Sequence, residues 1–477
     1  MNKENKTYHN YFLQFMSYHH DESYDKTSTF TIEVLGRLTP NDILRWMCQR
    51  VFGTPDPRNQ ELPCKIRSST LEVYKKALSW YMPNNMGSWN YIDNSGNPTK
   101  SKELRNLIKY VKRREVRKTG KETCTKRDLT EAEFRAILVF FQSKNDFQHK
   151  YRYYAMILYQ YYLIARCDDV GHFMIQDLHG HSDQRFSSFC IQTKVSWSKN
   201  VYEERDSPDQ VFFGSFDSQY CLFLALAIYL EVWLGDNVVN TNKRFLFGDS
   251  NNNSDDARTV DRIKYNYSQV LRRYFKFVNL SKVLGTHSIR KFAASWARAV
   301  GCLVDEIEGR GRWRQASRKV VSRYINVDQQ FLDARVAATL CIGGAIRYKL
   351  EDESGITDEW LYENVVPGIK EFFGEDPIVY VLALPLLYCC LHIDLDKLVP
   401  LTLSTRIKEA YELIRVLDVT INPVKRVLLH IYRNQDQVCI DEVLDVCDAN
   451  GNLVPYDNNL SNNTGSRGIN NKAVNIV

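Results

Sequence analysis

Six side chains between Arg166 and Tyr324 have the types needed to break a phosphate ester. Arg166 and Asp169 are three residues apart, a spacing that on a helix lets the carboxylate hold the guanidinium. His287 and Arg290 have the same spacing at an expected helix start, which puts both side chains on one face. The candidate residues for this chemistry are Arg166, Lys194, His287, Arg290, Trp313 and Tyr324.

These side chains suit cleavage of a phosphodiester without a metal ion. Two arginines supply planar, permanently charged forks that match a phosphate, and fixed charge of this kind usually gives the largest catalytic contribution. The Tyr324 oxygen can attack phosphorus and form a phosphotyrosine that keeps the bond energy for religation. His287 can accept the phenol proton or hydrogen-bond a phosphoryl oxygen. Lys194, at the end of a strand expected over 186–194, can protonate the leaving 5′ oxygen.

Each motif is weak by itself and has an ordinary structural interpretation. His-x-x-Arg occurs three times, beginning at His149, His287 and His430, and the chain has 28 Tyr. An Arg–Asp pair at a helix end is most often a plain ion pair. Only the middle His-x-x-Arg has an upstream Arg–Asp pair, a strand-end Lys and a downstream Gly-x-Trp and Tyr. The ordered combination therefore carries the prediction.

Other common catalytic motifs are absent from the sequence. It contains no P-loop, no GxSxG and no HExxH, and Gly309-Arg-Gly311 does not follow an expected strand, so it does not indicate a dinucleotide site. The 12 Cys are scattered without a CxxC pair, which argues against a disulfide framework or a zinc site and favours a reducing compartment. No metal or other cofactor is expected, because no carboxylate or His/Cys cluster has ligand spacing.

The combination resembles the tyrosine recombinase (integrase) family of DNA strand-transfer enzymes, through the ordered set Arg166, Lys194, His287-x-x-Arg290, Gly311-x-Trp313 and Tyr324. The likeness covers roughly 128–345 and is closest to eukaryotic Crypton-type recombinases and their kinetochore DNA-binding relatives. It implies that Arg166 is the first catalytic Arg, with Asp169 as its orienting acid. It also implies that Lys194 is the strand Lys and that His287 and Arg290 are the catalytic His-x-x-Arg pair. Trp313 takes the His/Trp position, and Tyr324 is the nucleophile that forms a 3′-phosphotyrosine intermediate. The separation of Trp313 and Tyr324, 11 positions, is longer than is usual in bacterial and phage members.

The resemblance leaves several functions open. The first is an active recombinase that integrates or excises the DNA of a mobile element. The second is a catalytically inactive, sequence-specific DNA-binding protein on the same fold, such as a centromere or transcription-factor-like protein. The longer Trp–Tyr spacing favours the second. Activity is favoured by the retention of Arg166, Lys194, His287, Arg290 and Tyr324, because a pure binding protein has no need of the tyrosine. A type IB topoisomerase would use similar chemistry without sequence specificity.

The elements that must position these residues follow from the apolar periodicity, which predicts an α+β protein, mostly helical, with a small sheet. A capping box at Thr130-Glu-Ala-Glu133 predicts a helix start just after a domain boundary near 127. Short strands are expected at 173–178 and 186–194. Five parts are expected in order, a polar arm, a helical DNA core-binding domain, a tyrosine recombinase catalytic domain, an acidic helical C-terminal domain and a disordered tail, over 1–25, 26–127, 128–345, 346–450 and 451–477.

Charge is distributed unevenly along the chain. The 63 Lys and Arg and the 57 Asp and Glu give a net charge of +6, but 1–350 holds 53 basic and 37 acidic residues, whereas 351–477 holds 10 and 20. The basic linker 100–127 alone has 12 basic and three acidic residues. It indicates a DNA-backbone contact or a nuclear import signal, although a solvated helix face is the commoner reason for such a run. The expected DNA-binding residues are Lys109, Lys112, Arg113, Arg114, Arg117, Lys118, Arg272 and Arg273.

The expected partner is double-stranded DNA, and the family likeness implies a homo-oligomer, a dimer or tetramer, on it. The acidic segment 346–450 is expected either to recruit a protein partner or to bury a face of the catalytic domain. The DNA substrate and the Lys112-Arg-Arg114 cluster favour the nucleus of a eukaryotic cell. No membrane association is expected, because the longest charge-free apolar run, Ile378 to Ile393, has 16 residues, short for a bilayer span, and the first residues lack a secretory signal.

Overall fold

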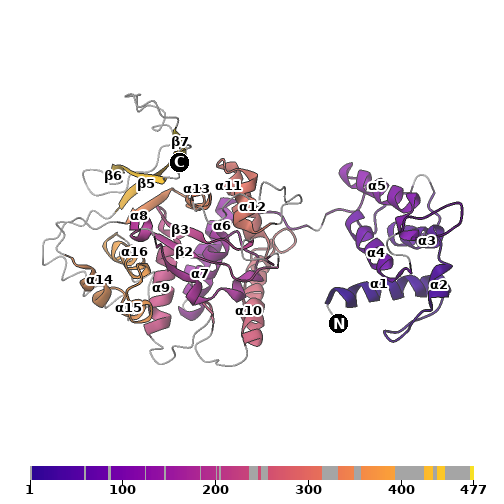
Figure 1. Cartoon of the computed structure of the whole chain (residues 1–477), viewed down its shortest axis with the longest axis horizontal. Helices are drawn as coiled ribbons and strands as arrows, with labels where there is room; N and C mark the ends of the chain where they lie inside the picture. The colour runs from indigo at the N-terminus through magenta and orange to yellow at the C-terminus, as the bar shows by residue number, and fades with distance from the viewer. Residues whose placement is uncertain are drawn as a thin grey trace. The chain divides into compact units, whose positions relative to one another are not determined.

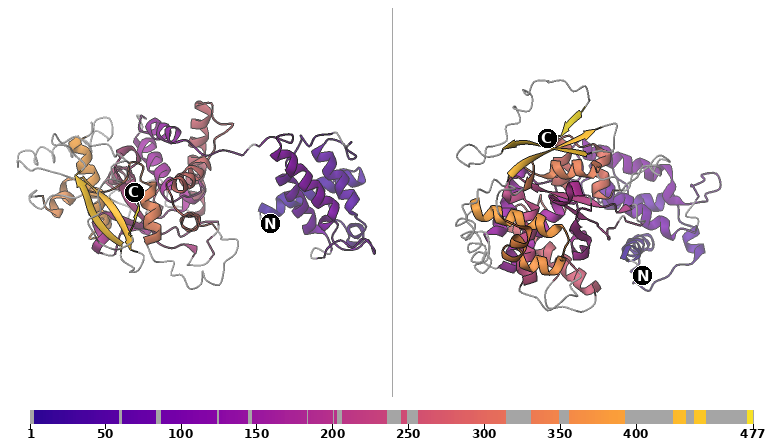
Figure 2. Two further views of the ribbon diagram at one scale, coloured as in Figure 1. Left: turned by 90° about the horizontal axis from the view of Figure 1, so that it is seen from above. Right: turned by 60° about the vertical axis from the view of Figure 1, so that its left-hand side comes forward.

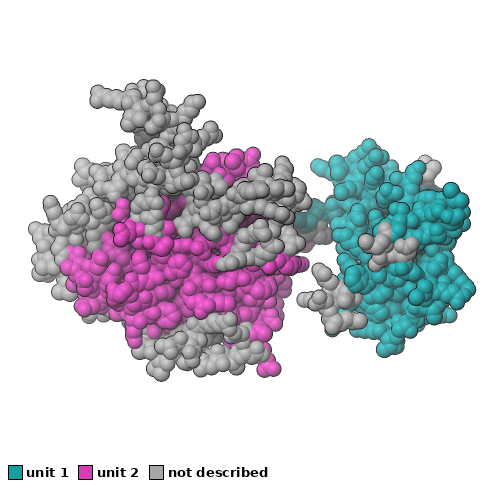
Figure 3. Space-filling model, in the orientation of Figure 1, with its two compact units in different colours: residues 1–125 teal, residues 126–477 magenta. Residues whose placement is uncertain are grey.

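The computed structural model divides the chain into two compact units, Met1–Thr125 and Lys126–Val477, which Figure 3 shows in different colours. Each unit has its own buried apolar cluster and is described by itself. The structure describes residues 3–58, 61–83, 87–123, 125–143, 147–182, 184–199, 201–202, 206–235, 245–248, 256–313, 331–348, 356–392, 424–432, 438–445 and 473–476.

The first unit is built from helices. Thr39 and Asp42 form a capping box at the start of the third helix, whose first residue is Pro40, and Ser101 caps the last. These caps satisfy backbone N–H groups that have no partner within the helix. The elements are α1 (Lys3–His20), α2 (Ile32–Gly36), α3 (Pro40–Val51), α4 (Ser68–Tyr81), the 3-10 turn η1 (Pro98–Lys100) and α5 (Lys102–Val116) (Figure 1).

The first segment is a helix rather than the loose polar arm expected for 1–25. In α1, Phe12, Phe15 and Met16 are buried in the core of the first unit, and the Phe15 ring meets Trp46 of α3 edge to face. Spacings of one, three and four residues put these side chains on one face of the helix. The expectation was wrong because polar residues between them hide the apolar stripe.

The second unit packs helices around a small antiparallel sheet (Figures 1 and 2). The capping box predicted at Thr130 and Glu133 is confirmed, since both of its hydrogen bonds are present at the first helix. Glu133 also binds Arg127 at 2.6 Å, and this hydrogen bond lowers the pKa of the Glu133 carboxyl to about 2. The helices are α6 (Glu131–Gln142), α7 (Phe147–Tyr162), α8 (Gln184–Ser187), α9 (Leu222–Gly235), α10 (Asp256–Phe277), α11 (Ser288–Ala299), α12 (Val304–Gly311) and α13 (Phe331–Leu340), and further helices follow between 358 and 392.

The sheet completes a mostly helical α+β fold, as expected. Its first four strands pair in chain order, each antiparallel to the next. The next strand continues this order, and two further strands pair with it. The strands are β1 (Leu178–Gly180), β2 (Cys190–Thr193), β3 (Gln210–Ser215), β4 (Ala345–Tyr348), β5 (Val424–Tyr432), β6 (Val438–Asp445) and β7 (Ala473–Ile476).

Several strands differ from those expected. The region 173–178 forms a 3-10 turn over Ile175–Asp177 and contributes only Leu178 to β1. The start of the region 186–194 belongs to α8, and β2 begins only at Cys190. β3 was not expected, because all of its residues are buried and show no alternation of apolar and polar side chains. β5, β6 and β7 lie in segments expected to be helical or disordered. β5 pairs with β4, which lies far away in the sequence, and β6 and β7 pair with β5.

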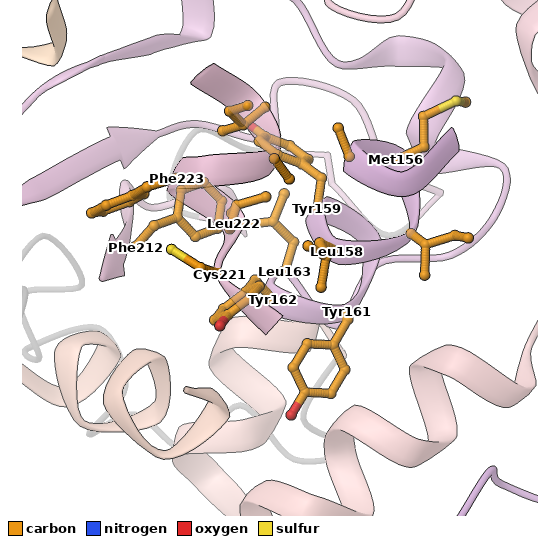
Figure 4. Packing of buried hydrophobic residues seen from close by; sticks show 14 of the residues in the cluster. Met156, Leu158, Tyr159, Tyr161, Tyr162, Leu163, Phe212, Cys221, Leu222 and Phe223 are labelled. Carbon is orange, nitrogen blue, oxygen red and sulfur yellow. The ribbon is translucent and has the colours of Figure 1, made fainter. Parts of the chain in front are cut away.

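The tyrosine-rich helix α7 lies in the core of the second unit (Figure 4). The Tyr162 hydroxyl donates to Tyr220 O at 2.8 Å, and the Tyr159 hydroxyl bonds Thr193 Oγ1 at 2.6 Å at the end of β2. Burial raises the pKa of the Tyr161 and Tyr162 phenols well above their ordinary value. Tyr159 therefore ties α7 to β2, Tyr162 ties it to the turn after β3, and the phenols of Tyr161 and Tyr162 stay protonated.

The segment expected to be a separate acidic domain begins with helices that join the core of the second unit, α14 (Asp358–Asn364), α15 (Pro367–Phe373) and α16 (Ile378–His392). The buried Glu231 carboxylate of α9 accepts the backbone N–H groups of Gly368 and Ile369 at the start of α15. Asp376 accepts the backbone N–H of Gly180 in β1 at 2.6 Å. These contacts favour the alternative in which the segment buries a face of the preceding part. Among the described helices, none is both long and apolar enough to cross a membrane.

Candidate active site

Arg166 lies just past the end of α7, where the chain turns sharply. Ile164 has a φ of 45°, and Asp169 Oδ2 accepts the backbone N–H of Arg166 at 2.8 Å. The Arg166 guanidinium donates to Ser198 Oγ at 3.1 Å, in the segment after β2. Asp169 therefore holds the Arg166 backbone by a hydrogen bond, where the spacing predicted a bond to the guanidinium, because these residues form a turn and not a helix.

Asp169 is buried among arginines. Its Oδ2 lies 3.9 Å from Arg290 Nη1 and 3.8 Å from Arg312 Nη2, and these three side chains are at most 7% exposed. Asp169 Oδ1 has no hydrogen-bond partner in the described part of the chain. Arg166 is close enough to Arg290 and Arg312 for its charge to disfavour theirs. Three guanidinium groups and one carboxylate leave a net charge of +2, for which a phosphate is a matching ligand.

Arg290 points from α11 into this arginine cluster. Its Nη2 donates to Gly311 O at 2.6 Å, and its guanidinium carbon lies 4.1 Å from the centre of the Trp313 ring, a cation–π contact. Its Nη1 is buried and has no hydrogen-bond partner among the described residues. Burial, with the charges of Arg312 and Arg166, lowers the pKa of the Arg290 guanidinium to about 9. An anion against Nη1 would satisfy the donor and offset the repulsion.

Gln160 connects the two backbone segments that carry the candidate residues. Its Nε2 donates to the carbonyl oxygens of Ala165 and Thr286 at 3.2 and 3.4 Å, and its Oε1 accepts from a buried tyrosine of α10. Ala165 directly precedes Arg166, and Thr286 directly precedes His287. The buried side-chain amide of Gln160 therefore fixes the distance between the backbone at Ala165 and the backbone at Thr286.

The other expected residues are not members of this arginine cluster. His287 is exposed at the N-terminus of α11 and makes no capping hydrogen bond. Lys194 directly follows β2 and is partly buried, and its backbone N–H donates to Asp177 O at 3.2 Å. Tyr324 lies outside the described residues. The structure thus brings together Arg166, Asp169, Arg290 and Trp313.

Two arginines of the site region were missed in the sequence. Arg310 is fully buried, pairs with Asp333 at 2.6 Å, and donates to the carbonyls of Tyr162 and Val211. Arg312 is buried beside Asp169, as described above. Both flank Gly311, in a phrase whose only expected functional residue was the tryptophan. Charged residues next to glycines are usually exposed, so no local pattern marks them as buried.

The expected DNA-binding residues lie on or directly after two helices. On α5, Leu104, Ile108 and Val111 are buried, which turns the basic side chains outward. Arg114 is partly buried and lies over the Tyr110 ring, 5.1 Å from its centre. The exposed members of the set are Lys109, Lys112, Arg113, Arg117 and Lys118 from α5 and the turn after it, and Arg272 and Arg273 on α10.

Arg272 and Lys264 of α10 also lie near the turn that carries Arg166 and Asp169, since their charges act on the Cys167 thiol. Burial nevertheless raises the pKa of that thiol to about 12, so Cys167 is not a nucleophile at neutral pH. In the parts of the chain that the structure describes, no three His, Cys, Asp or Glu side chains gather as a metal site. The chain matches no known protein-family model and no curated protein.

Proposed function

We propose that the protein is a tyrosine recombinase that cleaves and rejoins DNA through a 3′-phosphotyrosine, for integration or excision of a mobile element. The observation that carries the proposal is the buried cluster of Arg166, Arg290 and Arg312 around Asp169. It supplies fixed positive charge where a phosphodiester gains negative charge during cleavage. Arg290 Nη1, which no described residue binds, is a donor for a non-bridging oxygen.

In the proposed reaction, Arg166 and Arg290 bind the non-bridging oxygens of one phosphodiester. The Tyr324 oxygen attacks phosphorus while its proton passes to His287, and the bond from phosphorus to the 5′ oxygen breaks. Lys194 gives its proton to the leaving 5′ oxygen. Rejoining reverses these steps, because a 5′ hydroxyl displaces the tyrosine. By family likeness, the enzyme acts as a dimer or tetramer on DNA in the nucleus.

A covalent adduct tests this proposal. Duplexes that the purified protein retains from a random-sequence pool supply its target, and a nick beside the cleaved bond lets the released fragment diffuse away. We expect protein-linked DNA that survives SDS and disappears after protease digestion. The proposal is wrong if no selected duplex gives an adduct while binding is intact.

DNA affinity should depend steeply on salt through α5. Each phosphate contact contributes about 0.9 to the slope of log Kobs against log salt, so Arg113→Gln should lower the slope by about that amount and weaken binding to every sequence alike. Fluorescence anisotropy over a salt series measures this slope. Lys76→Gln, an exposed lysine of α4 in the same unit, is the control with an unchanged slope. Equal slopes in both variants would mean that α5 is not part of the DNA interface.

Gly311 leaves space for the contact between Trp313 and Arg290. A Cβ at Gly311 would lie 2.0 Å from Trp313 Cζ3, so Gly311→Ala should displace the indole. Loss of a desolvated cation–π contact is expected to lower the cleavage rate by roughly tenfold and to change the tryptophan fluorescence. Gly309→Ala is the matched control on α12, because among the described residues, apart from its own turn of the helix, no atom lies within 4 Å of a Cβ there. A similar loss of rate in both variants would contradict the role of this contact.

One observation favours a second candidate, a DNA-binding protein without catalysis. His287, the expected proton acceptor, is exposed and makes no capping hydrogen bond at the start of α11. This candidate predicts selection of a specific duplex, salt-dependent binding through α5, and no covalent adduct with any nicked target.

A further inference from the structure

Arg312 occupies a backbone conformation that favours glycine. It caps the C-terminal end of α12 with a φ of 53° and a ψ of 41°, the left-handed region, which a residue with a Cβ adopts at a cost. Helices that end in this way most often carry Gly, and sometimes Asn, at that position. A strained residue of this kind indicates that its side chain is needed there.

The Arg312 side chain connects several segments inside the protein. Its Nη1 donates to Gln210 Oε1 at 2.9 Å and to Arg310 O at 3.1 Å, and its Nη2 donates to Leu163 O at 3.3 Å. Its Nη2 also lies 3.8 Å from Asp169 Oδ2. The guanidinium therefore lies between the first residue of β3 and the turn that carries the first catalytic arginine.

The hydrogen bonds of the cluster distinguish Arg312 from Arg166 and Arg290. The Arg166 guanidinium turns to Ser198, and Arg290 has a buried donor that no described residue accepts. Arg312 donates to neutral acceptors, Gln210 Oε1 and two backbone carbonyls, and its Nη2 also lies 3.8 Å from the Asp169 carboxylate. Burial lowers the pKa of Arg312 to about 10, and Asp169 acts against this shift.

We propose that Arg312 is a positioning residue that neutralises Asp169 and so leaves the charges of Arg166 and Arg290 to the scissile phosphate. This inference rests on the proposed function. A phosphodiester carries one negative charge, whereas its five-coordinate transition state carries two, so a site of net charge +2 favours the transition state over the bound substrate. Without Arg312, two guanidinium groups and one carboxylate would leave a net charge of +1. The charge of Arg290 would then neutralise the Asp169 carboxylate instead of acting on the phosphate.

The test compares three variants of the full chain, Arg312→Gln, Arg312→Lys and the double variant D169N/R312Q. Arg312→Gln should lower the single-turnover cleavage rate about 100-fold while DNA affinity changes little, because the lost charge acts in the transition state. Arg312→Lys keeps the charge and should retain the rate within about tenfold. The double variant restores +2 and should recover at least about tenfold over Arg312→Gln. With a merely structural Arg312, the double variant would be no faster than the single one.

Binding of inorganic phosphate, measured by calorimetry, separates this inference from the proposed function. Phosphate affinity should fall in Arg312→Gln and return in D169N/R312Q, whether or not any DNA is cleaved. If no adduct forms but phosphate affinity follows this order, the proposed function fails and the charge-balancing role stands. An active protein whose rate and phosphate affinity are unchanged in Arg312→Gln overturns the inference. Should Arg312→Gln not fold, Asp169→Asn alone must tighten phosphate binding, and unchanged or weaker binding overturns the inference.

Discussion

Tyr324→Phe is expected to abolish the covalent protein–DNA adduct and leave DNA binding intact. Phe lacks the oxygen that attacks phosphorus, and removal of a nucleophile usually costs at least about 10⁴-fold in rate. The tyrosines of α7 cannot replace it, because burial holds the pKa of Tyr161 and Tyr162 well above the ordinary value. SDS gels of the nicked target measure the adduct, and anisotropy measures binding.

Tyr265→Phe is the matched control for this experiment. Tyr265 is 63% exposed on α10, so the change removes one phenol oxygen from the same unit without disturbing the core. We expect its adduct yield to equal that of the unmodified protein. An adduct that persists in Tyr324→Phe would mean that a different residue is the nucleophile, which would also account for the long spacing between Trp313 and Tyr324.

Arg310→Met is expected to lower the free energy of unfolding of the second unit by about 3–5 kcal/mol, the range found when one partner of a buried ion pair is removed. The Arg310 side chain is 0% exposed and lies 2.6 Å from Asp333. It also donates to Tyr162 O at 2.7 Å and to Val211 O at 2.9 Å. Methionine has a similar length but no donor, so two carbonyls and a carboxylate would lose a buried partner. Urea unfolding followed by tryptophan fluorescence measures the change.

The control for Arg310→Met is Lys370→Met on α15. Lys370 also lies 2.6 Å from its partner, Glu375, but that carboxylate is 92% exposed. Surface pairs of this kind contribute about 1 kcal/mol or less, so the control should unfold close to the unmodified protein. Equal destabilisation by both variants would mean that the buried network around Arg310 contributes no more than a surface ion pair.

The parts of the fold with local signals could be predicted from the sequence. Thr130 and Glu133 mark the start of α6 because both members of a capping box are three residues apart. β3 could not be predicted in this way, since it is buried throughout and pairs on one side with β4, from a distant segment. The same holds for β5, whose neighbour β4 lies far earlier in the chain.

In the candidate site, only the residues that belong to the motif combination in the sequence could be predicted. Arg166, Asp169, Arg290 and Trp313 were expected together and lie together. The burial of Arg312 could not be foreseen, because it depends on acceptors from the residue after α7 and from β3 that only folding brings within reach. Even the Arg166–Asp169 spacing predicted the wrong hydrogen bond, because a left-handed residue ends the helix before Arg166.

The packing of α16 against the second unit has a consequence for synthesis of the protein. Residues up to Leu387 belong to the same apolar core as α7, so the ribosome must translate past α16 before that core can close. The first unit has its own core within residues 1–125 and can fold while the rest is still being made. A nascent chain would thus have a folded, basic first unit well before the arginine cluster is assembled, and in the proposed function DNA cutting would begin only after α16 has been translated.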